Sequence, residues 1–96
     1  MIKYCFAYFN KLGDFYGQPF FVESKEGFTG SLRQALFAAK QEDLESLKED
    51  DLYLIGEFNN ETGEFKPSRE FVTSMSGLCH EVLIKKFGVE ENGGRA

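Results

Sequence analysis

The segment from Asp51 to Phe65 constrains the fold more than any other part of this 96-residue chain. Its first half, DLYLIGEFN, alternates side chains at the period of two that is typical of a β-strand. The next residues, NETG, have turn chemistry, and Gly63 can adopt the positive φ that a tight turn needs. The chain then returns as a short strand that we expect to end at Pro67, because proline lacks a ladder donor. The sequence therefore predicts a hairpin over residues 52–66.

Two further strands are expected before this hairpin. In residues 1–9, apolar side chains occupy both the odd and the even positions. This predicts a strand that is covered on both faces or nearly so. Residues 15–23 predict a second strand after a turn. Pro19 places this strand at an edge or at a bulge. The neighbours Phe20 and Phe21 must then point to opposite faces, so one ring is core and the other needs cover or is exposed.

The middle of the chain has helical spacing. We expect the glycines between residues 27 and 30 to break the chain and Ser31 to cap a helix that begins at Leu32. This helix either runs to about Lys48 or breaks near Gln41 into two pieces. In both versions its leucines face inward and its acidic residues face outward.

The last element covers about residues 78–87. Its apolar residues are spaced as in an amphipathic helix, and Gly88 suits a helix C-cap. Its β-branched residues leave a strand open as the alternative. Together the elements predict an α+β fold, with a small antiparallel sheet of about four strands packed by one or two helices. We expect residues 1–89 to form a single domain and residues 90–96 to be a flexible tail.

The net charge of −5 is concentrated in one segment. Residues 42–51 hold six acidic side chains and one lysine, which accounts for the whole imbalance. We define the acidic stripe as Glu42, Glu45, Glu49 and Asp50. It is either a solvated helix face or a patch that meets a basic partner. The chain lacks the basic footprint expected of a protein that holds nucleic acid by its phosphates.

Catalytic and metal chemistry find little support in the sequence. Cys5 and Cys79 are far apart, match no metal-ligand spacing, and are expected to be small buried hydrophobes of a reducing compartment. His80 is the only histidine, and no phosphate loop or calcium loop is found. We therefore expect a non-enzymatic protein without metal or cofactor. No apolar run approaches the roughly 20 residues of a membrane span, and the N-terminus does not read as a signal peptide, so a cytosolic protein is expected.

The aromatic content is high, with eleven Phe, four Tyr and no Trp. Most of these rings must be core. Phe15, Tyr16 and Phe21 are candidates for rings that remain free for a partner, either a protein or the bases of single-stranded DNA. A homo-oligomer is also plausible, since both faces of the first strands are apolar.

Three strings occur in a characteristic order: QPFF at residues 18–21, Arg33-Gln34-Ala35, and DLYLIGEFNNETGEF. Over about residues 1–67 the chain resembles the small non-structural protein of gokushovirus-type microviruses, which are single-stranded-DNA phages. It departs from that pattern at Asn59-Asn60, in its acidic linker and in its longer C-terminal element. The resemblance implies a protein of the infected bacterial cytoplasm, absent from the virion shell and often labelled DNA-binding. It supplies no catalytic residues.

Three functions follow as hypotheses. The first is a phage accessory protein that binds a replication, packaging or host protein. The second is a single-stranded-DNA-binding protein in phage genome replication. The third is an acidic mimic of nucleic acid that inhibits a host defence system, for which the acidic stripe would be the contact surface.

Overall fold

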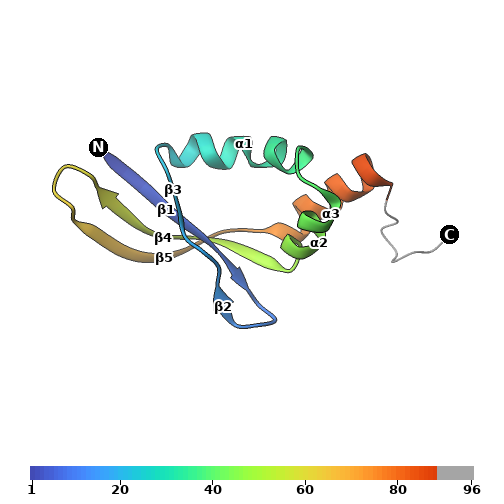
Figure 1. Ribbon diagram of the computed structural model, residues 1–96, viewed down its shortest axis with the longest axis horizontal. Helices are drawn as coiled ribbons and strands as arrows, with labels where there is room; N and C mark the ends of the chain where they lie inside the picture. Colours follow the sequence, from blue (N-terminus) through green and yellow to red (C-terminus); the bar gives the residue numbers. More distant parts are fainter. Residues whose placement is uncertain (89–96) are drawn as a thin grey trace.

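The computed structural model describes residues 1–88 and shows a five-stranded antiparallel sheet with three helices (Figure 1). The α+β class predicted from the sequence is confirmed. The predicted tail, residues 90–96, and residue 89 lie outside the described residues. The strands are β1 Ile2–Asn10, β2 Phe15–Tyr16, β3 Phe20–Val22, β4 Asp50–Asn59 and β5 Phe65–Ser74. The helices are α1 Lys25–Phe37, α2 Gln41–Leu47 and α3 Met75–Phe87.

The first strand lies in the middle of the sheet. Along one edge β1 pairs with β4, and along the other it pairs with β2 and then β3. The hairpin partner β5 continues the sheet beyond β4, so the order is β2-β1-β4-β5 with β3 beside β1. Five strands form instead of about four, because the segment around Pro19 divides residues 15–23 into two short edge strands.

The hairpin continues beyond its predicted end. The expectation that Pro67 ends the returning strand is wrong, since β5 runs through it to Ser74. β5 is an edge strand, where a missing N–H is tolerated, and its register with β4 shifts beside Pro67. At the same place the ring of Phe65 lies against Gly56: a Cβ there would come within 2.2 Å of the ring and 2.9 Å of the Lys66 carbonyl oxygen. Gly56 therefore makes room for the hairpin to close.

Helix α1 begins earlier than the sequence indicates. The predicted break at residues 27–30 and the predicted N-cap at Ser31 are wrong. The N-cap is Ser24, whose hydroxyl accepts a hydrogen bond from the Gly27 N–H at 2.9 Å. A glycine inside a helix costs only about 1 kcal/mol relative to alanine. The packing of Phe28 and Leu32 against the core outweighs that preference.

The two-piece version of the central helical region is the correct one. α1 ends at Phe37, and α2 begins at Gln41 after a short connection. The C-terminal element is a helix rather than a strand, with Ser74 as its N-cap and Gly88 at φ 70° as its C-cap. No helix within residues 1–88 is long and apolar enough to cross a membrane.

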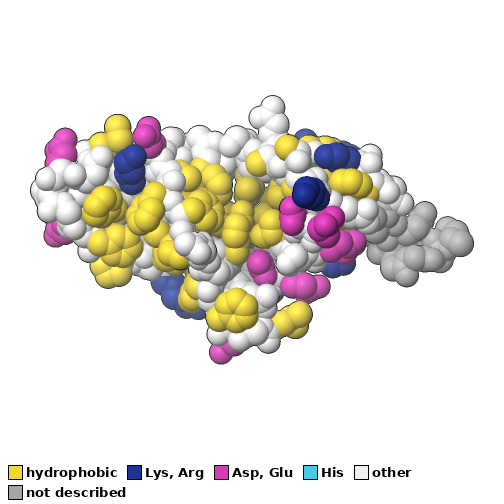
Figure 2. Space-filling model, in the orientation of Figure 1, with side chains coloured by type: hydrophobic (Ala, Val, Ile, Leu, Met, Phe, Trp, Pro, Cys, Tyr) yellow, Lys and Arg dark blue, Asp and Glu magenta, His cyan; other side chains and the backbone are white. Residues whose placement is uncertain are grey.

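The core lies between the sheet and the three helices. Phe6, Leu52 and Leu54 of the sheet meet buried residues of all three helices. Both cysteines are free and buried, as expected for small hydrophobes. Figure 1 shows α1 above the strands, with α2 and α3 gathered at the end where β4 begins and β5 ends. In the same orientation, acidic side chains cluster on this end and hydrophobic ones in the middle, below α1 (Figure 2).

Candidate functional site

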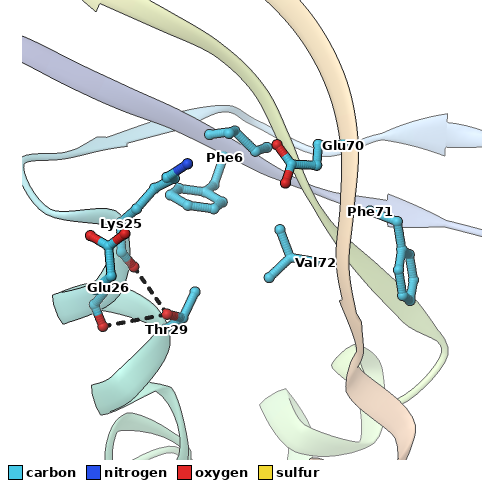
Figure 3. A pocket seen from close by; sticks show the side chains of 8 residues that line it. Phe6, Lys25, Glu26, Thr29, Glu70, Phe71 and Val72 are labelled. Carbon is cyan, nitrogen blue, oxygen red and sulfur yellow. Dashed lines mark hydrogen bonds between the residues drawn. The ribbon is translucent and has the colours of Figure 1, made fainter.

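The two faces of the sheet have different surroundings. Figure 3 shows this on β5, where Glu70 and Val72 point toward α1 and Phe71 points away from it. Strand alternation and register extend this division across the sheet. We call the side that carries Phe71 the open face, because none of the three helices covers it.

The open face carries one aromatic ring from each of four strands. Tyr16 of β2, Phe9 of β1, Tyr53 of β4 and Phe71 of β5 form this aromatic row. The ring centroids are 4.8 Å apart for Phe9–Tyr16, 6.1 Å for Phe9–Tyr53, 5.7 Å for Tyr16–Tyr53 and 5.8 Å for Tyr53–Phe71. Most of these contacts are edge-to-face, which is a favourable aromatic geometry. The two ends of the row stay accessible, with Phe71 54% and Tyr16 37% exposed.

A guanidinium group lies over this row. Arg69 of β5 donates a hydrogen bond from Nε to the Tyr16 hydroxyl at 2.5 Å, and its guanidinium carbon is 5.0 Å from the centroid of the Tyr53 ring. The hydrogen bond to Tyr16 raises the pKa of Arg69 from its ordinary value. The open face therefore holds a fixed positive charge among apolar rings.

A second group of rings continues the open face toward the β4–β5 turn. Phe21 of β3 meets Phe58 of β4 at 6.0 Å between centroids, and Phe58 is paired with Phe65 of β5. Phe21 is 52% exposed and Phe65 is 42% exposed. The open face is thus an extended apolar surface rather than one accessible ring.

The charges on the open face are few. Register places Lys3, Asp51 and Arg69 there. Lys3 forms an ion pair with Glu23 at 3.4 Å, and Asp51 lies 3.4 Å from the Lys11 ammonium. The acidic residues of α2 lie in the helical layer instead. The open face is therefore less acidic than the molecule as a whole.

The predicted aromatic candidates separate onto the two sides of the sheet. Tyr16 and Phe21 are on the open face, in different groups of rings. Phe15 lies on the helical side, because it precedes Tyr16 in β2 and neighbouring residues of a strand face opposite ways.

Sequence analysis did not single out Phe9, Tyr53 or Phe71 as partner-binding rings. The signal for Tyr53 was present, since it occupies the alternation opposite to Leu52 and Leu54. Phe71 and Arg69 could not be placed while the strand was expected to end at Pro67.

The acidic stripe is not uniform in the structure. Glu42 and Glu49 are exposed, whereas Glu45 is 2.8 Å from the Lys48 ammonium, and the hydrogen bond with Lys48 lowers its pKa. Asp50 begins β4, where one carboxylate oxygen is buried without a hydrogen-bond partner. Burial first, and then the neighbouring charges of Asp51 and Glu49, raise the pKa of Asp50.

Within residues 1–88, no group of three or more His, Cys, Asp or Glu side chains could hold a metal ion. Burial raises the pKa of Cys79 to about 11, so its sulfur is a protonated thiol near neutral pH rather than a nucleophilic thiolate.

No protein-family model, curated protein or solved structure matches this chain.

Proposed function

We propose that this is a non-enzymatic accessory protein of a small single-stranded-DNA phage, acting by binding a protein through the open face of its sheet. One observation carries the proposal: a row of aromatic rings crosses four strands, and none of the three helices within residues 1–88 covers it. Single exposed apolar residues are ordinary on protein surfaces, but contiguous apolar patches mark interaction sites.

The composition of the open face is that of a protein interface. Aromatic residues and arginine are enriched in interfaces, while lysine and the acidic residues are depleted. Full burial of a large apolar side chain contributes about 1.5–3 kcal/mol. Phe71, Phe21 and Phe65 are each 42–54% exposed, so a partner that covers them removes substantial apolar surface from water. The fixed rings also lose little conformational entropy on binding.

The charges of the open face favour a protein over nucleic acid. Its cations are Arg69, Lys3 and the nearby Lys11, and the two lysines already have carboxylate partners. Three phosphate contacts give a salt slope of only about −2 for a single strand. The whole chain carries a net charge of −5, which opposes the approach of a polyanion.

The resemblance to a gokushovirus-type non-structural protein supports the setting. It suggests the cytoplasm of an infected bacterium and a partner from phage replication, from packaging or from the host.

Affinity capture from infected cells tests the proposal, using the wild type, Phe71→Ser and Leu12→Ser. Leu12 is 81% exposed in the β1–β2 turn, so its substitution removes exposed apolar surface at a different place. We expect a protein that the wild type and Leu12→Ser retain equally and that Phe71→Ser retains at least about tenfold less. Circular dichroism confirms that all three are folded. Recovery of no specific protein by the folded wild type contradicts the proposal.

Single-stranded DNA is a second candidate for the same face. Arg69 within the aromatic row favours it, because bases stack on rings and arginine can contact phosphate. Titration of tyrosine fluorescence with oligo-dT at low and at moderate salt tests it. Tight binding that Arg69→Gln weakens would replace the protein proposal, and no binding at low salt removes this candidate.

A further inference from the structure

A groove of about 730 Å³ lies on the helical side of the sheet. One wall is α1, the other is formed by β1 and the short strands β2 and β3, and α2 with the start of β4 closes one end. Figure 2 views the molecule from a side where hydrophobic side chains gather below α1 and acidic ones lie beside α2. The groove is separate from the open face, which is on the other side of the sheet.

The long walls of the groove are apolar. Phe28, Leu32 and Leu36 come from α1, and Tyr8 and Phe20 come from the sheet. Phe20 and Phe28 meet edge to face, with centroids 5.5 Å apart, so these walls hold one another in place.

Two small side chains line the same groove, Ala35 of α1 and Ala39 of the connection between α1 and α2. Small residues leave room for another backbone to come close to the wall. A wall that combines large side chains with small ones is complementary to one face of a helix. On that face, apolar residues three and four positions apart in the sequence project on the same side.

One end of the groove is acidic. Asp43 of α2 and Asp50 of β4 both line it. One carboxylate oxygen of Asp50 is buried and has no hydrogen-bond partner. A partner can therefore meet only the other Asp50 oxygen and the exposed carboxylate of Asp43, where a cationic donor forms a charge-assisted hydrogen bond. Within the part of the chain that the structure describes, no lysine or arginine forms an ion pair with either of these carboxylates.

We infer that this groove binds an amphipathic helix of a partner protein, with a lysine or arginine of that helix meeting Asp43 and Asp50. Apolar walls and an acidic end are complementary to a helix that has an apolar stripe and a cationic end. The acidic end of the groove sets the direction in which the helix lies. Because the groove and the open face are on opposite sides of the sheet, the protein could hold two partners at once.

Selection from a library of displayed helical peptides of about 18 residues (roughly 27 Å long) tests the inference. The library keeps a helical framework and randomises the outward positions. We expect selected peptides to share an apolar stripe with lysine or arginine toward one end. Selection of peptides with no such cation overturns the inference.

Variants of the protein locate the contact for the best selected peptide. Asp43→Asn with Asp50→Asn should weaken binding at least about tenfold. The matched control is Glu42→Gln with Glu49→Gln, which removes the same charge from the same segment at residues that do not line the groove. Equal losses in the two double variants would show general electrostatic attraction and overturn the inference.

The apolar wall has its own matched pair. Ala35→Glu places a long charged side chain in the groove, and Gln34→Glu adds the same charge to α1 at an exposed residue that does not line it. We expect only Ala35→Glu to abolish binding. Phe71→Ser should leave the peptide affinity unchanged, so failure of the open-face proposal remains distinguishable. A dimer that dissociates in Ala35→Glu would mean that a second copy occupies the groove, against the inference.

Discussion

The two faces of the sheet are built from similar residues and differ in their surroundings. On the helical side Phe6 is 1% exposed and belongs to the core, whereas on the open face Phe71 is 54% exposed. Both are phenylalanines on strands of one sheet. The difference lies in what covers them, because three helices are enough to cover one face of the sheet only. Aromatic content therefore means core packing on one face and exposed apolar surface on the other.

The largest effect is expected for Phe6→Ala. Removing a buried ring leaves a cavity as well as lost apolar contact, and such changes cost about 3–5 kcal/mol. That is a large share of the roughly 5–15 kcal/mol that stabilises a typical domain. Urea unfolding followed by circular dichroism measures it. A loss below about 1 kcal/mol would mean that the covered face is not the core.

Gly56→Ala should come next, at about 1–3 kcal/mol. The added methyl group would meet the Phe65 ring at 2.2 Å and the Lys66 carbonyl oxygen at 2.9 Å. The ring can move, but the strand backbone yields less easily. Gly30→Ala in α1 is the control, since a Cβ there meets nothing within 4 Å. The two substitutions should shift the unfolding midpoint in opposite directions, because alanine favours a helix over glycine.

Phe71→Ala sharpens the comparison between the faces. It removes the same side chain as Phe6→Ala from a surface that is half exposed, so the free energy of unfolding should fall by less than about 1 kcal/mol. Binding of the partner should fall much more. If the stability loss approached that of Phe6→Ala, the open face would be structural rather than a binding surface.

The smallest effects concern two carboxylates of the helical side. Arg33 of α1 binds Glu81 of α3, with Nε 3.1 Å from the carboxylate, and Lys85 also contacts it at 3.0 Å. These hydrogen bonds lower the pKa of Glu81 from 4.5 to about 2. The stabilisation is therefore complete above about pH 4.5 and is lost as the pH falls toward 2. Glu81→Gln should lower the thermal midpoint at pH 7 by a few degrees, and the gap to the wild type should close over that window. Glu64→Gln in the β4–β5 turn is the control.

Asp50 has the opposite sign. Its pKa is raised above 3.8 by burial and by its acidic neighbours, so ionisation costs stability as the pH rises through the pKa of the folded state. Asp50→Asn should raise the thermal midpoint at pH 7 slightly, and the gain should disappear below about pH 3.8. A lower midpoint at pH 7 would show that the carboxylate supports the fold.

The parts of the fold that local pattern decides were predictable. The alternation in residues 51–59 and the turn at Gly63 predicted β4 and the start of β5, and the apolar spacing with the C-cap at Gly88 favoured the final helix. The start of α1 was not predictable in this way, because packing of Phe28 overrides the glycines beside it. Likewise, a proline at position 67 would end the strand only if a neighbouring strand needed a backbone N–H there. An edge strand has one side without such a neighbour.

The candidate site was less predictable than the fold. Tyr16 and Phe21 could be singled out as spare rings, but their neighbours on the open face depend on strand order and register. Phe9 meets Tyr16 only because β2 folds back on β1, and Tyr53 meets Phe71 only because β5 is long. The sequence shows the acidic stripe as a local excess of acidic residues. The burial of Asp50 is visible only in the structure.

The central place of β1 has a consequence for how the protein is made. β1 leaves the ribosome before β4, with which it pairs from Asn10–Asp50 to Ile2–Asn59, so about 50 further residues must emerge before that ladder is complete. Until then only the short strands β2 and β3 protect one edge of β1. We therefore expect slow closure of the sheet, because contacts between distant residues require costly loops. The nascent chain would meanwhile expose a long aromatic strand, for which a chaperone or a rapidly available partner would be of value.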